Sequence, residues 1–307
     1  MSALIELVGL GKRFGRKQAL DGIDLALDGA QLVGVVGPDG AGKTTLLRSI
    51  AGLLEIEART ARVLGHDLRG DVRALKARVG YVPQVFALQR ELSVMENLRF
   101  TARLHRLPAD VFERRAAQLL QRTDLAAFAD RRAAALSGGM RQKLAIVNAL
   151  LPEPALLVLD ECTAGVDVLA RAEIFELLDE RRADVLTVLS TSYLDETERC
   201  DRLVYLDRGR VVATGTPEEL RERAGVELYR AWGAAPREIA RAASDLPFVS
   251  SVRPSGRSAR VEVDVARTPG EAAVLEALVA RAGAALAERV TVDMESTLLA
   301  LARRQAA

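Results

Sequence analysis

The stretch Gly37-Pro38-Asp39-Gly40-Ala41-Gly42-Lys43-Thr44-Thr45 decides how this chain folds. It follows the apolar run Leu32–Val36 and opens a stretch in which apolar residues recur at helical spacing. A phosphate-binding loop requires this order of strand, loop and helix. Its glycines let the backbone N–H groups face anionic oxygens, and the helix that follows adds the positive end of its dipole. The sequence therefore predicts a nucleoside triphosphate site.

Two side chains at the end of the loop have predicted roles. Lys43 can reach the β- and γ-phosphates of the nucleotide, and Thr44 falls where a hydroxyl can hold a magnesium ion. The alternative is a glycine turn with an incidental Lys-Thr pair. ATP and Mg²⁺ are the expected ligands.

Composition limits the classes of function. The chain has 307 residues, which suggests two domains, the first the larger. Its net charge is +1, and no block of like charge stands out, so nucleic acid is not an expected partner. The sequence shows no signal peptide, and apolar runs such as Leu144–Leu151 are too short to span a bilayer. We expect a cytoplasmic protein that works at the inner face of the cell membrane through another subunit.

Cysteine and histidine residues offer no predicted metal site. Cys162 and Cys200 lie far apart in the sequence and are expected to be free thiols. His66 and His105 have no accompanying cluster of Cys, Asp or Glu, so we expect ordinary surface or half-buried side chains.

The pattern of apolar residues predicts an α/β core. Residues 2–36 alternate apolar and polar side chains, which predicts a short antiparallel β layer with Phe14 in its turn. The unbroken apolar runs Leu156–Leu159 and Val185–Leu189 are typical of a parallel sheet covered by helices on both faces. Other expected elements are a helix at 45–53, strands at 79–82 and 203–206, a mostly helical stretch at 95–135 interrupted by Pro108, and a helix from Ser137 to Leu151.

A change of pattern near residue 226 predicts a second, small α+β domain. Thr268-Pro269 are expected to start its second helix, as cap and first-turn proline, and Gly283 to end it. The expected domains are a nucleotide-binding domain at 1–222, with a helical subdomain at about 92–150, and an accessory domain at 226–307. Its expected elements are strands at 226–232, 248–253, 258–265 and 286–292, with helices at 237–244 and 271–282.

Two further motifs carry chemistry. Asp160 and Glu161 end a buried strand, where open α/β sheets bind ligands, so Asp160 is placed to support magnesium and Glu161 to act on water. The alternative is a helix-cap pair. Ser137-Gly138-Gly139 offers a hydroxyl and flexible amides at another helix N-terminus, a second anion-binding feature. One nucleotide seldom needs two such sites from one chain.

In this order and at this spacing, the three motifs resemble the signature of the ATP-binding cassette family over residues 2–220. The resemblance implies a P-loop NTPase core with an antiparallel β subdomain and a helical insert. In that family two nucleotide domains pack head to tail, and each ATP lies between the phosphate loop of one domain and the signature of the other.

The resemblance also assigns roles to single residues. Phe14 would stack on adenine or is a packed aromatic residue, and Gln84 would approach magnesium and water or is a polar loop residue. Asp167 would link the two sites across the dimer. The expected nucleotide-binding residues are Phe14, Gly37, Pro38, Asp39, Gly40, Ala41, Gly42, Lys43, Thr44, Thr45, Ser137, Gly138, Gly139 and Asp167. Thr44, Gln84 and Asp160 are expected at the metal, and Glu161, Gln84 and Ser192 in catalysis.

Finer similarity points to the ATPase components of bacterial drug-type exporters, whose membrane parts are often separate chains. It rests on the phosphate loop, on Gly80–Gln84 and Leu92–Leu98, and on Leu136–Lys143. Residues 292–301 look like the C-terminal tail of that group, or like any amphipathic helix. The implied partners are a membrane permease and a second nucleotide-binding domain, either identical or from a related ATPase.

Three departures from the family pattern matter. Ser192 stands where a histidine usually touches the γ-phosphate and the base. Losing a hydrogen bond to a charged group costs ~1.5–3 kcal/mol, roughly ten- to a hundredfold in rate. Slow hydrolysis, or a partner with the better site, is therefore expected, unless a neighbouring group or water fills in. Cys162 replaces a usual proline, which predicts a looser turn before Asp167, and residues 55–63 lack the usual Pro and Gly turn, which leaves the β edge there open.

Three functions follow from these observations. The expected one is an export motor, closed by ATP binding and reopened by hydrolysis. A soluble cassette ATPase acting on ribosomes or DNA is the alternative, but such proteins commonly carry two cassettes or coiled-coil inserts. A binding regulator with negligible hydrolysis is the third, motivated by Ser192.

Overall fold

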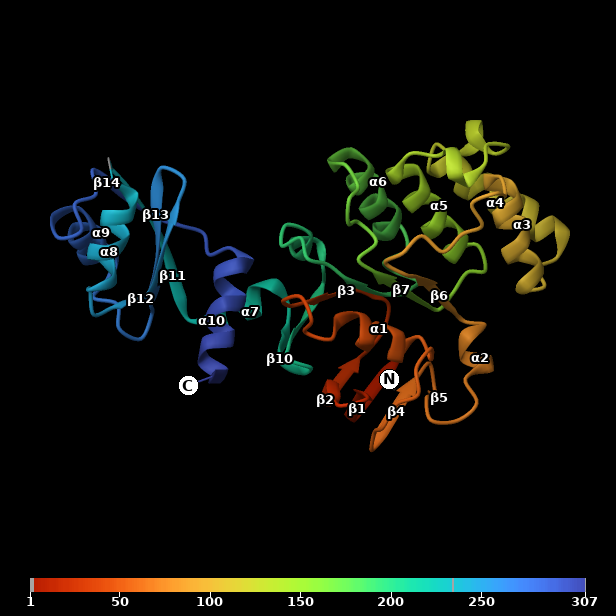
Figure 1. Ribbon diagram of the computed structural model, residues 1–307, viewed down its shortest axis with the longest axis horizontal. Coiled ribbons are helices and arrows are strands. Elements are labelled where there is room, and N and C mark those ends of the chain that lie inside the picture. The colour runs from red at the N-terminus through yellow and green to blue at the C-terminus, as the bar shows by residue number, and fades with distance from the viewer. Residues whose placement is uncertain (1–2, 234, 307) are drawn as a thin grey trace. The chain divides into compact units, whose positions relative to one another are not determined.

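The computed structural model describes residues 3–233 and 235–306 (Figure 1). Residues 1, 2, 234 and 307 of the predicted domains lie outside the described residues. Contacts divide the chain into two compact units, one through Thr214 and one from Gly215 onward. The sequence placed this boundary between residues 222 and 226. The contacts assign helix α7 (Pro217–Ala224) to the second unit, because α7 packs on α10 (Met294–Ala306) there.

A four-stranded antiparallel sheet forms the first layer of the first unit, in the order β2-β1-β4-β5. The predicted antiparallel layer is confirmed for its first two strands, and Phe14 pairs with Lys17 at their turn. The edge that the sequence left open is formed by two short strands after residue 59. The strands are β1 (Ile5–Phe14), β2 (Lys17–Leu27), β4 (Thr60–Val63) and β5 (His66–Asp67).

A six-stranded sheet forms the second layer, in the order β10-β9-β3-β8-β7-β6. The prediction that residues 2–36 form one layer is wrong for β3, which pairs in parallel with β8 and β9. Its residues 32–36 are all buried, which suits a strand covered on both faces. The strands are β3 (Gln31–Val36), β6 (Val79–Val82), β7 (Leu156–Asp160), β8 (Leu186–Ser190), β9 (Arg202–Asp207) and β10 (Arg210–Gly215).

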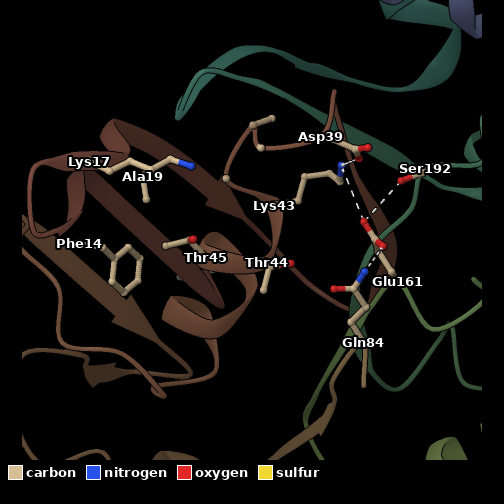
Figure 2. A pocket seen from close by; sticks show the side chains of 13 residues that line it. Phe14, Lys17, Ala19, Asp39, Lys43, Thr44, Thr45, Gln84, Glu161 and Ser192 are labelled. Carbon is tan, nitrogen blue, oxygen red and sulfur yellow. Dashed lines mark hydrogen bonds and ion pairs between the residues drawn. The ribbon is translucent and has the colours of Figure 1, made fainter. Parts of the chain in front are cut away.

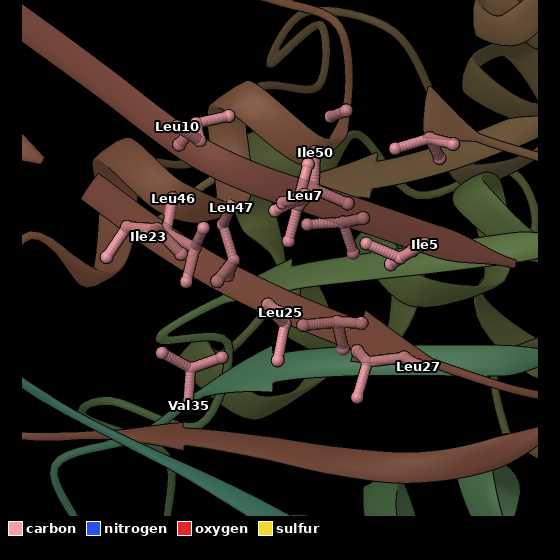
Figure 3. Packing of buried hydrophobic residues seen from close by; sticks show 14 of the residues in the cluster. Ile5, Leu7, Leu10, Ile23, Leu25, Leu27, Val35, Leu46, Leu47 and Ile50 are labelled. Atoms are coloured by element: carbon pink, nitrogen blue, oxygen red, sulfur yellow. The ribbon is translucent and has the colours of Figure 1, made fainter. Parts of the chain in front are cut away.

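Side chains from β1, β2, β3 and α1 (Lys43–Ile50) build the core of this unit (Figure 3). Leu46, Leu47 and Ile50 point from α1 into this core and are fully buried. This packing fixes the helix that follows the phosphate loop. The other helices are α2 (Arg73–Lys76), α3 (Val94–Leu104), α4 (Ala109–Arg122), α5 (Gly138–Leu150) and α6 (Val168–Asp179), with 3₁₀ turns at Ala126–Phe128, Ala133–Ala135 and Glu196–Arg199.

The second unit has the order βαββαβ, and its antiparallel sheet runs β12-β13-β11-β14. This is the ferredoxin-like arrangement, a finer result than the predicted small α+β domain. Helices α8 and α9 pack their apolar residues on Tyr229, Val261 and Val263 of the sheet. The elements are β11 (Val226–Trp232), α8 (Pro236–Ser244), β12 (Val249–Ser255), β13 (Ser258–Asp264), α9 (Glu271–Ala280) and β14 (Leu286–Val290).

The predicted start of α9 is wrong. Thr268 is not its cap, because its hydroxyl instead accepts a hydrogen bond from the Gly270 N–H at 3.2 Å and closes a short turn. Gly270 is the N-cap, with φ +101°, and the helix begins at Glu271. The helix ends at Ala280, three residues before Gly283.

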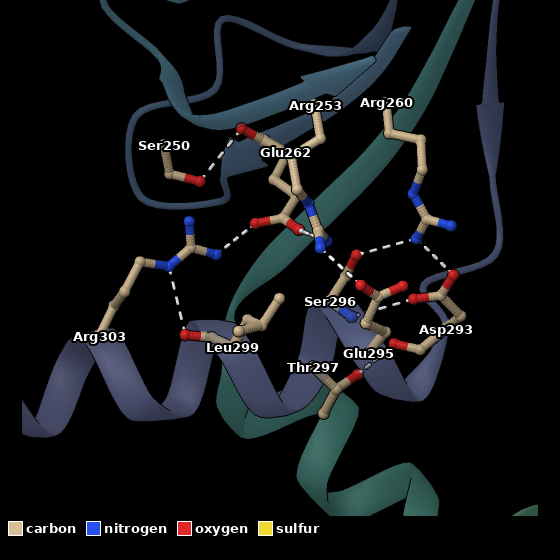
Figure 4. A network of polar contacts seen from close by, with 10 residues as sticks. All are labelled: Ser250, Arg253, Arg260, Glu262, Asp293, Glu295, Ser296, Thr297, Leu299 and Arg303. Carbon is tan, nitrogen blue, oxygen red and sulfur yellow. Dashed lines mark hydrogen bonds and ion pairs between the residues drawn. The ribbon is translucent and has the colours of Figure 1, made fainter. Parts of the chain in front are cut away.

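Polar contacts hold α10 to strands β12 and β13 (Figure 4). The buried carboxylate of Glu262 accepts hydrogen bonds from Arg253 on β12 and from Arg303 on α10. Arg260 donates to Asp293 and to the Ser296 hydroxyl at the start of α10. No helix in the described part of the chain combines the length and the apolar character needed to cross a bilayer.

Candidate nucleotide-binding site

The predicted phosphate loop joins β3 to α1 and needs glycine at two positions. Gly42 is the N-cap of α1 with φ +108°, and a Cβ there would lie 2.7 Å from the carbonyl oxygen of Ala19. A Cβ on Gly37 would lie 2.0 Å from the carbonyl oxygen of Leu206. Since contacts this short exclude any side chain, the loop can take this path only with glycine.

Lys43 holds a positive charge over the loop. Its side chain is only 5% exposed, and its ammonium donates to the carbonyl oxygens of Gly37 at 2.9 Å and Pro38 at 3.3 Å. Its Nζ also lies 3.9 Å from Oε1 of Glu161. This buried ammonium is therefore shared between the loop and the carboxylate that follows β7.

Asp160 and Thr44, which are both expected at the metal, are in direct contact. Oδ1 of the fully buried Asp160 accepts hydrogen bonds from the hydroxyls of Thr44 and Ser190, each at 2.9 Å. Carboxylate and hydroxyl oxygens are the donors that Mg²⁺ prefers, and Mg²⁺ commonly binds one or two carboxylates together with substrate phosphates. Within residues 3–233 and 235–306, no group of three or more His, Cys, Asp or Glu side chains could hold a metal ion.

Two predicted catalytic side chains, those of Gln84 and Ser192, converge on the carboxylate of the third, Glu161 (Figure 2). Gln84 Nε2 donates to Glu161 Oε2 at 2.7 Å, and the Ser192 hydroxyl lies 3.4 Å from Oε1. Glu161 has φ +48°, a left-handed conformation that is uncommon for a residue other than glycine. Its backbone N–H donates to the Ser190 hydroxyl at 2.9 Å.

Gln84, Glu161 and Ser192 line a pocket of about 530 Å³. In Figure 2, Phe14 and Glu161 lie toward opposite ends of this pocket. Phe14 is half exposed there, with the Lys12 ammonium 5.2 Å from its ring. Lys17 and Ala19 also line the pocket and were missed by the sequence reasoning, although the nearness of Lys17 to Phe14, with which it pairs across the β1–β2 turn, could have indicated that residue. The other lining residues are Asp39, Gly40, Ala41, Gly42, Lys43, Thr44 and Thr45.

The remaining predicted residues form a second patch outside this pocket. We call Ser137, Gly138, Gly139 and Asp167 the signature patch. Ser137 caps α5 by accepting from the Met140 N–H at 3.2 Å, and Asp167 caps α6 by accepting from the Ala170 N–H at 3.0 Å. A Cβ on Gly139 would lie 2.8 Å from the Cβ of Ala170, so the two helix starts pack closely. Within one chain the patch does not contribute to the pocket that contains Lys43.

Both cysteines are free, as predicted, and the structure shows that both are buried. Burial raises the pKa of the Cys162 thiol and raises the pKa of Cys200 to about 12. The turn after Glu161, where Cys162 stands in place of the usual proline, keeps backbone hydrogen bonds from Ala164 to Glu161 at 3.1 Å and from Val166 to Thr163 at 3.2 Å.

Sequence reasoning also missed a buried carboxylate behind Ser192. Glu196 is almost fully buried, accepts a hydrogen bond from Thr191, and lies 3.6 Å from the Arg171 guanidinium on α6. Burial raises the pKa of Glu196. Arg171 also stacks 4.0 Å from the ring of Tyr193. Because Arg171 lies 22 positions before Tyr193 and 25 before Glu196, only the fold brings it to them.

Comparison with known proteins decides the family. A family model described as ABC transporter matches residues 20–164. The daunorubicin resistance ATP-binding protein DrrA3 of Streptomyces coeruleorubidus is 41% identical over 223 residues, which are 72% of this chain and 71% of that protein. The chain belongs to the ABC transporter family. The predicted P-loop α/β core with an additional C-terminal region is confirmed with it.

Other relatives of this ABC protein carry related names. The probable multidrug ABC transporter ATP-binding protein YbhF of Escherichia coli is 39% identical over 274 residues, 88% of this chain. The chain spans about half of that relative, since the match covers 47% of it. The Nod factor export ATP-binding protein I of Ralstonia nicotianae is 39% identical over 219 residues, 71% of this chain and 68% of that protein.

Solved structures agree with this ABC fold. The structure of an ATP binding subunit of an ABC transporter is 33% identical with a TM-score of 0.67, covering 72% of this chain and 93% of that chain. The structure of cbiO1 from Clostridium perfringens, described as part of the ABC transporter complex cbiONQ, is 27% identical with a TM-score of 0.66 and covers 72% and 91%.

Proposed function

We propose that this chain is the ATP-binding and hydrolysing subunit of an exporter, and that it drives a separate membrane subunit from the inner face of the cell membrane. The observation that carries the proposal is the convergence of Lys43, Thr44, Glu161 and Gln84 on one pocket, with the buried Asp160 hydrogen-bonded to Thr44. The names of the relatives, which concern drug resistance and Nod factor export, support the direction of transport.

The residues of the nucleotide site have different roles in hydrolysis. The loop amides and Lys43 bind the phosphates, and Phe14 receives the adenine ring. Thr44, Asp160 and Gln84 would hold Mg²⁺, which when bound neutralises charge on the phosphates. Glu161, oriented by Gln84 at 2.7 Å, accepts the proton of the water that attacks the γ-phosphate.

A second nucleotide-binding domain completes the site. Ser137, Gly138 and Asp167 are exposed, and the pocket of one chain does not include them. Val168 and Leu169 beside Asp167 are 76% and 78% exposed, an apolar pair that burial in a dimer would remove from water. We propose that the signature patch of one domain covers the ATP held by Lys43 of the other.

Helix α3 offers the surface for the membrane subunit. Val85, Phe100 and Leu104 are exposed apolar side chains, and the last two lie one helical turn apart. The buried Asn97 of α3 donates to the carbonyl oxygen of Gln89 at 3.0 Å and accepts from the Gln89 N–H at 2.9 Å. The segment after Gln84 is thereby tied to α3, so a movement of Gln84 is passed to this surface.

Hydrolysis is proposed to be slow in this site. The 3.4 Å between Ser192 and Glu161 exceeds the 2.5–3.0 Å of a good O–H···O hydrogen bond. The hydrogen bond from Ser192 to Glu161 is therefore weaker than one from a charged or longer donor would be.

The main proposal is tested with Glu161→Gln and with a second substitution, Ser137→Arg, in the signature patch. We expect Glu161→Gln to abolish ATP hydrolysis and to form a stable dimer when Mg-ATP is added, measured by light scattering after gel filtration. Ser137→Arg in the Glu161→Gln background should bind ATP and remain monomeric. Purification from the native host in mild detergent should recover a polytopic membrane chain. Recovery of ribosomal subunits instead, or a dimer that forms despite Ser137→Arg, would contradict the proposal.

A further inference from the structure

We propose that Ser190 is a positioning residue that sets the geometry of both carboxylates in the nucleotide site. This inference rests on the roles proposed above for Asp160 and Glu161. Ser190 is the last residue of β8, and its Cα pairs with that of Asp160, the last residue of β7. The side chain of Ser190 is 1% exposed, so water does not compete for its hydroxyl.

One hydroxyl serves two neighbours at once. A serine hydroxyl has one proton to donate and lone pairs to accept with. Ser190 donates to Asp160 Oδ1 at 2.9 Å and accepts from the backbone N–H of Glu161 at 2.9 Å. The Thr44 hydroxyl donates to the same Oδ1 at 2.9 Å. Ser190 and Thr44 therefore fix which way the Asp160 carboxylate turns toward the metal position.

The bond to Glu161 fixes an unusual backbone. A residue other than glycine keeps φ near +48° only where its surroundings hold it there. The Ser190 hydroxyl binds the N–H of that very residue. The side chain that leaves this backbone has one short partner, Gln84 at 2.7 Å, and two more distant ones, Ser192 at 3.4 Å and Lys43 at 3.9 Å. Because Ser192 restrains the carboxylate so little, its direction depends on the backbone that Ser190 holds.

The same strand provides a matched control. Thr187 is 2% exposed and also lies on β8, three residues before Ser190. Successive side chains of a strand point to opposite faces, so Thr187 and Ser190 lie on different faces of the sheet. Thr187→Val therefore removes a buried hydroxyl from β8 without touching Asp160 or Glu161.

The test compares Ser190→Ala, Ser190→Thr and Thr187→Val in the full chain. Four quantities are measured: kcat, KM for ATP, the Mg²⁺ concentration that gives half-maximal activity, and the melting midpoint. For Ser190→Ala we expect kcat to fall on the order of tenfold, the Mg²⁺ requirement to rise several-fold, and the binding of ATP in EDTA to stay as in the wild type. Ser190→Thr keeps the hydroxyl and should restore most of kcat. Thr187→Val should change the melting midpoint alone.

Two results would overturn the proposal. One is a Ser190→Ala variant with wild-type kcat and Mg²⁺ dependence. The other is a Ser190→Ala variant that loses kcat, EDTA-ATP binding and melting midpoint together, which would mark Ser190 as a folding residue. If the wild type hydrolyses no ATP, the proposed function has failed, and the inference is then decided by nucleotide affinity: Mg²⁺ should tighten ATP binding in the wild type and Ser190→Thr but not in Ser190→Ala.

Discussion

Replacing Ser192 by histidine tests whether the missing imidazole limits this site. In the structure, the Ser192 hydroxyl lies 3.4 Å from Glu161 Oε1, a contact too long to count as a good hydrogen bond. A histidine extends from the same Cβ by a whole ring, so a ring nitrogen can close the remaining gap to the carboxylate. The substitution therefore adds a contact to a charged group without removing a strong one.

The expected gain follows from the strength of that contact. A hydrogen bond to a charged group contributes ~1.5–3 kcal/mol, and each 1.36 kcal/mol in a barrier is a factor of about ten in rate. If the bond matters mainly in the transition state, Ser192→His should raise kcat by roughly ten- to a hundredfold. KM for ATP should change little, because Lys43 and the loop bind the phosphates before the reaction.

The assay is the release of inorganic phosphate at saturating Mg-ATP, with nucleotide affinity measured separately. Ser192→Leu is the matched control, since it adds bulk without a donor and should give no gain. The double variant Ser192→His, Glu161→Gln should lose the gain as well, because the carboxylate partner is absent. A Ser192→His protein that binds ATP normally and turns over at the wild-type rate would refute the reasoning and show that another group already supports Glu161.

Three further outcomes are expected. Cys162 and Cys200 should resist a thiol reagent at pH 8 in the native protein and both react in guanidinium, because burial raises the pKa of each thiol. Leu278→Ala should destabilise the second unit by ~2–5 kcal/mol, followed in urea by the fluorescence of the chain's one tryptophan, Trp232, which lies in that unit. Burial raises the pKa of Glu196 above its ordinary 4.5, so the folded state binds its proton more tightly, and stability relative to Glu196→Gln should fall as pH rises from about 4.5 through the raised pKa.

The sequence predicted those parts of the fold that depend on local pattern. The apolar runs at β7 and β8 identified buried parallel strands, and the glycine spacing of the loop identified the phosphate site, because both signals lie within a few consecutive residues. The sheet to which β3 belongs was not predicted correctly. The prediction grouped its apolar run at 32–36 with the alternating residues before it, and its pairing with β8 and β9, more than 150 residues later in the chain, assigns it to the other sheet.

The residues of the site divide in the same way, into those that a local motif identifies and those that only the fold brings together. Lys43, Thr44, Asp160 and Glu161 were predicted because each belongs to a motif, and the structure gathers them in one pocket or at its edge. Ser190 has no motif of its own, since its role arises from standing beside Asp160 across two strands 30 residues apart. The prediction of the start of α9 failed for a related reason. A Thr-Pro pair that begins a helix has the same local sequence as one whose Thr hydroxyl closes a turn onto Gly270.

The weak contact at Ser192 has a consequence for how hydrolysis is coupled to other movements. With Ser192 at 3.4 Å, the shortest polar partner of the Glu161 carboxylate among the contacts described is Gln84 at 2.7 Å. Gln84 begins the segment that Asn97 ties to α3, where Val85 and Phe100 are exposed. A subunit that binds this surface and shifts the segment would therefore move the principal support of the catalytic carboxylate. A histidine at position 192 would supply a second support and weaken that dependence, so we expect stimulation by the membrane subunit to be larger in the wild type than in Ser192→His.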